Sequence, residues 1–207
     1  MRNSPLPIFA LALTLFLLPD VGAWFHHPSP IDSVRGLAWV TKEGFGNHCT
    51  VTSINEQEHF WLTASHCITT EQPMFIAGEP ADVVMVTPLV EVAILHTHIA
   101  HAPALKLASH APDYGDAVEL VGFPLGWFYP LLIHGSISSP AFPQNHHVFA
   151  VTQLTVAPGN SGSAVLNANH RIVGLITISF SSAIALSSFV GCFIRVNPPP
   201  SVCCTAV

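Results

Sequence analysis

The chain has few charged residues, and few of those are basic. Only 9% of its 207 residues are Asp, Glu, Lys or Arg, and Lys and Arg together number six, so the formal net charge is -6. Binding to nucleic acid depends on clustered cations that neutralise phosphates, whereas these six are scattered along the sequence. The composition therefore argues against a nucleic-acid partner. Hydrophobic residues make up 50% of the chain, which is enough to bury a sizeable core.

Apolar runs of membrane-spanning length are also missing. The apolar run 8–18 is too short to span a bilayer comfortably; it follows Arg2 and precedes the small residues 21–23. This order is typical of a secretory signal peptide. We expect residues 1–23 to be cleaved off after Ala23, which leaves a secreted, periplasmic or extracellular protein with no membrane partner. The uncharged stretch 172–194 is interrupted by Gly, Ser and Thr, so we expect buried strands and a loop there.

Helical periodicity is scarce, and short β-rich runs separated by turn residues take its place. Six runs precede a linker near residues 101–114, and six follow it. The runs cover residues 36–41, 48–54, 59–64, 74–76, 82–87, 92–96, 117–121, 131–137, 148–152, 163–166, 172–177 and 192–196. All-β chains of this size form sandwiches or barrels. We predict two six-stranded antiparallel β-barrels, at about 34–100 and 115–197, in one domain over residues 34–197, with an N-terminal segment at 24–33 and a C-terminal tail at 198–207.

Ser161 lies in the segment Pro-Gly-Asn-Ser-Gly-Ser at 158–163. A nucleophilic serine needs an exposed hydroxyl on a sharply bent backbone, and flanking glycines permit that bend. They also leave the backbone N–H groups of Gly159 and Ser161 free to face a developing oxyanion. The alternative is an ordinary turn between two strands.

His66 is a candidate general base, because histidine is the usual residue that accepts the proton of a serine hydroxyl. A third group should be a carboxylate that orients the imidazole. Glu91, at the start of an apolar strand, is the first candidate, and Asp82 and the more distant Asp116 are alternatives. Each residue could instead be an ordinary polar residue facing water.

Five cysteines in an exported chain suggest at least one disulfide. A Cys49–Cys67 bridge would pin the turn that carries the histidine to the preceding strand. The pairing of Cys192, Cys203 and Cys204 stays open.

Two motifs together resemble a known family. Thr-Ala-Ser-His-Cys at 63–67 and Gly-Asn-Ser-Gly-Ser at 159–163 are similar to the histidine and serine motifs of chymotrypsin-like or trypsin-like serine peptidases, and the order His, acid, Ser is that of the family. The segments 115–126, 134–138 and 157–167 resemble the protease domain of the bacterial Htr/Deg branch. The resemblance covers about residues 34–196.

The resemblance implies an active site between two barrels, with His66, Glu91 and Ser161 as catalytic residues. Gly159 and Ser161 would form the oxyanion hole. The sequence departs from the family at Glu91, where Asp is usual, and at Ser163, where a second glycine is usual. We expect no PDZ-like domain after the barrels.

The specificity pocket can also be outlined from the resemblance. Thr155 stands where a trypsin-like pocket would carry Asp. Without that negative charge, the pocket does not attract a substrate Lys or Arg before the cut. Leu175, Ile176 and Thr177 would line the pocket edge and pair with the substrate backbone. We therefore expect a small or medium apolar residue before the cut.

The resulting prediction is a serine endopeptidase that hydrolyses polypeptides through an acyl-enzyme and needs no cofactor. The alternatives are a catalytically inactive, protease-like protein that binds peptides, and a structural protein built on a barrel scaffold. His96, His98 and His101 are close in sequence, but no neighbouring carboxylate or cysteine completes a tetrahedral set. We therefore expect no metal, and the oligomeric state stays open.

Overall fold

A computed structural model describes residues 29–42, 44–88, 91–139, 148–152, 154, 156–180, 183–188, 192–195 and 201–204. The expected signal peptide at 1–23 and the pocket residue Thr155 lie outside these residues. Among the described residues, no helix has both the length and the apolar character needed to cross a membrane.

The N-terminal half is an antiparallel sheet whose strands follow the order β5-β4-β1-β2-β3-β7-β6. These strands are β1 (Val34–Thr41), β2 (Gly44–Asn55), β3 (Phe60–Ala64), β4 (Phe75–Ile76), β5 (Glu79–Pro80), β6 (Asp82–Thr87) and β7 (Val92–His96). Strands β3 and β7 consist mostly of apolar residues and are almost completely buried, whereas β6 lies at an edge and is largely exposed. The prediction of six strands closed into a barrel therefore differs from the ladder formed by the described residues, which has seven strands in an order that does not close on itself.

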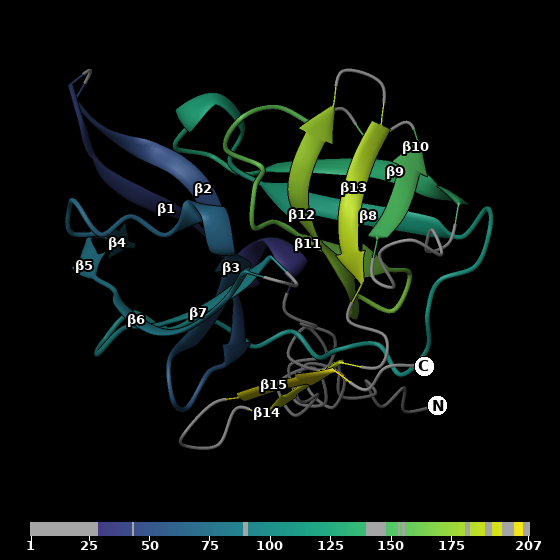
Figure 1. Ribbon diagram of the computed structural model, residues 1–207, viewed down its shortest axis with the longest axis horizontal. Helices are drawn as coiled ribbons and strands as arrows, with labels where there is room; N and C mark the ends of the chain where they lie inside the picture. Colours follow the sequence, from purple (N-terminus) through teal and green to yellow (C-terminus); the bar gives the residue numbers. More distant parts are fainter. Residues whose placement is uncertain are drawn as a thin grey trace, which may run out of the picture.

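The C-terminal half is a closed six-stranded barrel. Its strands are β8 (Ala117–Gly122), β9 (Leu131–Ser139), β10 (Val148–Thr152), β11 (Ala164–Asn167), β12 (Ile172–Phe180) and β13 (Ala183–Ser188). Figure 1 shows this barrel beside the N-terminal sheet, with β11 and β12 on the side facing β3. Short 3-10 turns, η3 (Pro30–Ser33), η4 (Ser65–Cys67) and η6 (Pro124–Gly126), complete the described framework.

The sixth barrel strand is not the one that the sequence predicts. Strand β13 closes the barrel by pairing with β10 and β12. Its segment contains two serines and follows Ser181 and Ser182, a composition that favours loops. Instead of joining the barrel, β14 (Cys192–Arg195) pairs with β15 (Ser201–Cys204) in a separate hairpin, whose register sets Cys192 opposite Cys204.

One hydrophobic core joins the two halves. Leu62 and Ile94 of the sheet and Leu166 and Leu175 of the barrel are fully buried in the same cluster. Each such side chain contributes about 1.5–3 kcal/mol when it is buried, so the two halves are held together by apolar packing. The candidate site lies on this junction.

Candidate active site

His66 lies in η4, immediately after buried strand β3. The neighbouring Cys67 forms a disulfide with Cys49 of β2, with 6.1 Å between the Cα atoms. This confirms the predicted bridge. Because one end of the turn continues β3 and the other is tied to β2, the backbone around His66 is fixed on both sides. The imidazole itself is 42% exposed.

Glu91 faces His66 across the end of the sheet. Its Oε2 lies 3.3 Å from Nδ1 of His66 and accepts a 2.8 Å hydrogen bond from Oγ of Ser65. The Ser65 N–H also donates to the main-chain oxygen of Glu91 at 3.1 Å. Ser65 therefore holds both the backbone and the carboxylate of Glu91 beside the imidazole.

The backbone of Glu91 adopts an unusual conformation, with φ at +55°. This left-handed region costs a non-glycine residue about 1–2 kcal/mol, and such strain persists only where surrounding contacts impose it. The N–H of Glu91 donates to the oxygen of Pro88 at 3.2 Å, so this conformation ends a turn just before β7. This backbone conformation places the Glu91 carboxylate beside the His66 imidazole.

Asp82, the alternative carboxylate, lies elsewhere. Its Oδ2 is 3.3 Å from Nε2 of His98, and its backbone pairs with His96 at the far end of β7 from Glu91. The structure thus brings His66 together with Glu91 and places Asp82 beside other histidines.

Thr50 of β2 anchors the loop that contains Ser161. The Thr50 N–H donates to the oxygen of Ser161 at 2.8 Å, and its hydroxyl donates to the oxygen of Gly159 at 2.8 Å. The same hydroxyl accepts from the N–H of Phe123 at 3.0 Å, and Thr50 is fully buried. Because Thr50 follows the disulfide residue Cys49, the serine loop and the histidine turn are tied to the same stretch of β2.

Gly162 brings the serine loop against the sheet. Its φ is +83°, and a Cβ at this position would collide with the oxygen of Thr50 and the hydroxyl of Thr63. Its N–H donates to the oxygen of Ile176 at 2.7 Å. Only glycine fits here, because the conformation is left-handed and the space is closed.

The two amides predicted for an oxyanion hole have no backbone acceptor within the described part of the chain. The carbonyl of Pro158 accepts from the Leu125 N–H at 2.6 Å. Since carbonyl and N–H point in opposite directions in a trans peptide, the Gly159 N–H is directed away from Leu125. Likewise, no hydrogen bond to a described residue engages the Ser161 hydroxyl, and catalytic hydrogen bonds are often long without substrate.

The predicted pocket residues of β12 are buried. Leu175 belongs to the core shared by the two halves, Ile176 belongs to the barrel core, and Thr177 is 4% exposed. Ile176 is bonded through its N–H to the oxygen of Ser163, at 2.9 Å. Strand β12 is therefore attached directly to the serine loop.

An open cleft borders the other side of the serine loop. It is lined by residues 46–48 of β2, by Leu125 and Gly126 of η6, and by Pro158 and Gly159. Trp127, Phe128 and Tyr129, which follow η6, are all more than half exposed.

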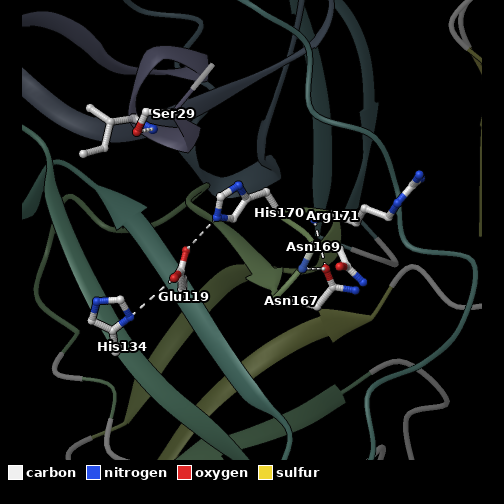
Figure 2. A network of polar contacts seen from close by, with 8 residues as sticks. Ser29, Glu119, His134, Asn167, Asn169, His170 and Arg171 are labelled. Carbon is white, nitrogen blue, oxygen red and sulfur yellow. Dashed lines mark hydrogen bonds and ion pairs between the residues drawn. The ribbon is translucent and has the colours of Figure 1, made fainter. Parts of the chain in front are cut away.

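A second polar network lies on the barrel and does not involve the predicted site. Glu119 of β8 lies between His134 of β9, at 3.6 Å, and His170 of the β11–β12 turn, at 3.7 Å (Figure 2). The turn is closed by Asn167, whose Oδ1 accepts from the N–H groups of Asn169 and Arg171, each at 3.0 Å. Because both histidines are largely exposed, such pairs contribute little to stability.

Gly162 is one of the two glycines that the sequence analysis expected to permit the bend at Ser161, whereas Thr50 and Ser65 shape the site and had no assigned role. Their signal in the sequence is position alone, because each is adjacent to a residue that was singled out, Cys49 or His66. A buried threonine that joins two sheets cannot be distinguished from any other strand threonine without the fold.

Comparison with known proteins agrees with this geometry. Residues 49–175, more than half of the chain, match the family described as "Trypsin-like peptidase domain". Among solved structures, the chain is similar to the crystal structure of the serine endoprotease from Yersinia pestis, with a TM-score of 0.64 and 21% identity over 77% of this chain and 59% of that chain. The chain thus matches less than two thirds of that protein's length. No curated protein matches.

The similarity to the Yersinia pestis structure confirms the predicted chymotrypsin-like fold, and the domain match confirms the resemblance from which it was inferred. The chain belongs to the trypsin-like peptidase family.

Proposed function

We propose that the chain is an active serine endopeptidase in which Ser161 is the nucleophile, His66 the general base and Glu91 the residue that orients His66. The observation that carries this proposal is the 3.3 Å approach of the Glu91 carboxylate to Nδ1 of His66. With Nδ1–H donating to Glu91, Nε2 is left as the basic nitrogen. The tie between the Ser161 loop and β2 supports the presence of the nucleophile in the same place.

The reaction proceeds by acyl transfer. Nε2 of His66 takes the proton from Ser161 as the serine oxygen attacks the scissile carbonyl, and the N–H groups of Gly159 and Ser161 stabilise the oxyanion. His66 then returns the proton to the leaving amine, and the acyl-enzyme forms. Water repeats the cycle and releases the acid product.

The substrate is a polypeptide with a small or medium apolar residue before the cut. Exposed aromatic residues after η6 favour apolar residues beyond the cut as well. We also propose export of the chain after cleavage at Ala23. Sequencing of the mature N-terminus tests this, and a first residue of Met1 in the mature protein would contradict it.

The proposed activity is tested with a peptide library digested by the purified chain, with new N-termini identified by mass spectrometry. We expect cleavage by the native chain and none by Ser161→Ala. If both proteins are folded and neither cleaves, while both bind peptides equally, the chain is a binding protein and the enzyme proposal fails.

The role of Glu91 is tested in the same assay with Glu91→Gln. At 3.3 Å, the attraction between Glu91 and an imidazolium is about 1.3 kcal/mol in water and about 5 kcal/mol near a protein surface. Because the two side chains are 42% and 35% exposed, screening favours the lower end. We therefore expect kcat to fall about 10- to 100-fold, with KM little changed.

Matched variants show whether the effect belongs to the site. Glu71→Gln removes an exposed carboxylate in the loop after η4, and Asp82→Asn removes the alternative carboxylate. Both should keep native kcat. A large fall in kcat for Asp82→Asn, together with native kcat for Glu91→Gln, would mean that Asp82 and not Glu91 is the carboxylate that orients His66.

A further inference from the structure

The pairing of β6 with β7 brings a carboxylate to two of the clustered histidines. Asp82 opens β6 and lies directly opposite His96, the last residue of β7, in the antiparallel register. Side chains opposite each other in such a pair share a face and lie about 4.5–5.5 Å apart at Cβ. The sequence offered no acidic partner for these histidines, because Asp82 is distant from them along the chain.

His98 joins the same face because Thr97 points the other way. Thr97 is fully buried, and its hydroxyl accepts from Nε1 of Trp61 at 2.9 Å and donates to the oxygen of Ala100 at 2.7 Å. The side chain of His98 is instead 74% exposed. The rings of His96 and His98 lie side by side, with centroids 5.0 Å apart.

The three side chains have the spacing of a metal site. Each of Asp82, His96 and His98 offers a ligand atom within 4.8 Å of the other two, and the distance from Oδ2 of Asp82 to Nε2 of His98 is 3.3 Å. A tetrahedral zinc ion with ligands at about 2.05 Å separates those ligands by about 3.3 Å. The distance between the Asp82 carboxylate and the His98 imidazole thus already equals the distance between two ligands of a tetrahedral zinc ion.

We propose that Asp82, His96 and His98 bind a zinc ion on the outer face of the β6–β7 ladder, with water as the fourth ligand. Two imidazoles and a carboxylate suit zinc better than Mg²⁺ or Ca²⁺, which prefer oxygen ligands. His101, the third histidine of the sequence cluster, is not part of the site; its ring lies against His59.

The bound ion clamps an exposed edge strand. Strand β6 is the last strand of the described sheet (Figure 1). Its side chains Val83, Val84 and Val86 are exposed. An unpaired edge of this kind is prone to fraying and to pairing with other chains. Zinc joins the first residue of β6 to the end of β7 and so stabilises the folded sheet by linkage. The site is independent of the proposed catalysis.

The test uses the full chain, purified without a polyhistidine tag and freed of metal with a chelator. Zinc chloride is titrated by calorimetry, and the melting temperature is recorded with and without zinc. At a zinc concentration about 100 times Kd, we expect Tm to rise by about 5–10 °C. Mg²⁺ and Ca²⁺ should produce no rise.

Variants locate the ion. His98→Ala and Asp82→Asn alter exposed side chains, so both should fold, and each should lose most of the zinc-dependent rise in Tm. His110→Ala removes an exposed histidine from the linker, and Glu91→Gln removes a carboxylate near His66; both should keep the full rise. With Co²⁺, the native chain should show the visible absorption of four-coordinate cobalt, and His98→Ala should not.

Two outcomes overturn the proposal. One is an equal rise in Tm for the native chain, His98→Ala and Asp82→Asn, which would mean adventitious binding to scattered histidines. The other is a native chain whose Tm does not rise with zinc.

Discussion

Thr50 and Thr52 offer a paired test of how the serine loop is held. Both are fully buried threonines of β2, but they differ in their hydroxyls. The Thr50 hydroxyl bonds Gly159 and Phe123, whereas that of Thr52 has no hydrogen-bond partner among the described residues. Replacement by valine keeps the shape and removes only the hydroxyl.

The expected effects have opposite signs. Thr50→Val leaves a buried carbonyl and a buried N–H unpaired, at about 1–3 kcal/mol each, and the new methyl recovers about 0.8 kcal/mol. We expect the free energy of unfolding to fall by about 3 kcal/mol, which lowers Tm by about 6–12 °C for a chain of this size. Thr52→Val removes an unpaired buried hydroxyl, so Tm should rise by about 2–4 °C.

Calorimetry measures the two Tm values. The rate of labelling by a fluorophosphonate measures the reactivity of Ser161. Thr50→Val should label about 10- to 100-fold more slowly, because Gly159 loses its support and small displacements of catalytic groups are costly. Thr52→Val should label at the native rate. Equal shifts in Tm of the same sign, or native labelling by Thr50→Val, would refute this role for Thr50.

The remaining predictions concern the neighbouring residues. Gly162→Ala should lower Tm by about 5–15 °C and abolish labelling, because its Cβ would meet backbone atoms at a positive φ; Gly46→Ala, where a Cβ meets open space, should keep the native Tm in the same calorimetric scan. The double variant Cys49→Ala/Cys67→Ala opens a loop with a sequence separation of 18. Its free energy of unfolding, measured by urea titration, should therefore be about 3 kcal/mol lower than that of the native chain. An unchanged midpoint of the titration would contradict that value. Ser65→Ala removes the hydroxyl that holds Glu91 and should slow labelling about 3- to 10-fold; a rate equal to that of Ser161→Ala would mean a larger role than positioning.

Much of the fold could be predicted from short-range pattern. The runs at β3 and β7 are apolar enough to be recognised as buried strands, and the turn residues between strands mark their ends. The closing strand β13 was missed because its serines resemble a loop, and only pairing with β10 and β12 makes it a strand. Closure of the N-terminal half was overpredicted, because strand counting cannot tell a closed ladder from an open one.

The candidate site was predictable to the extent that its residues lie in motifs. His66, Ser161 and the Cys49–Cys67 bridge are marked by their neighbours in sequence. Ser65 and Thr50 act through contacts with residues 26 and 109 positions away, Glu91 and Gly159, and no local pattern reports such contacts. The same reason hid the approach of Asp82 to His96 and His98, which depends on the register of β6 against β7.

The most direct test of the central claim is covalent labelling of the folded native chain with a fluorophosphonate, followed by mass spectrometry of its peptides. The account predicts one labelled site, at Ser161, and no labelling of Ser161→Ala with the same circular dichroism spectrum. A folded native chain that takes up no label, or takes it up at another residue, would contradict it.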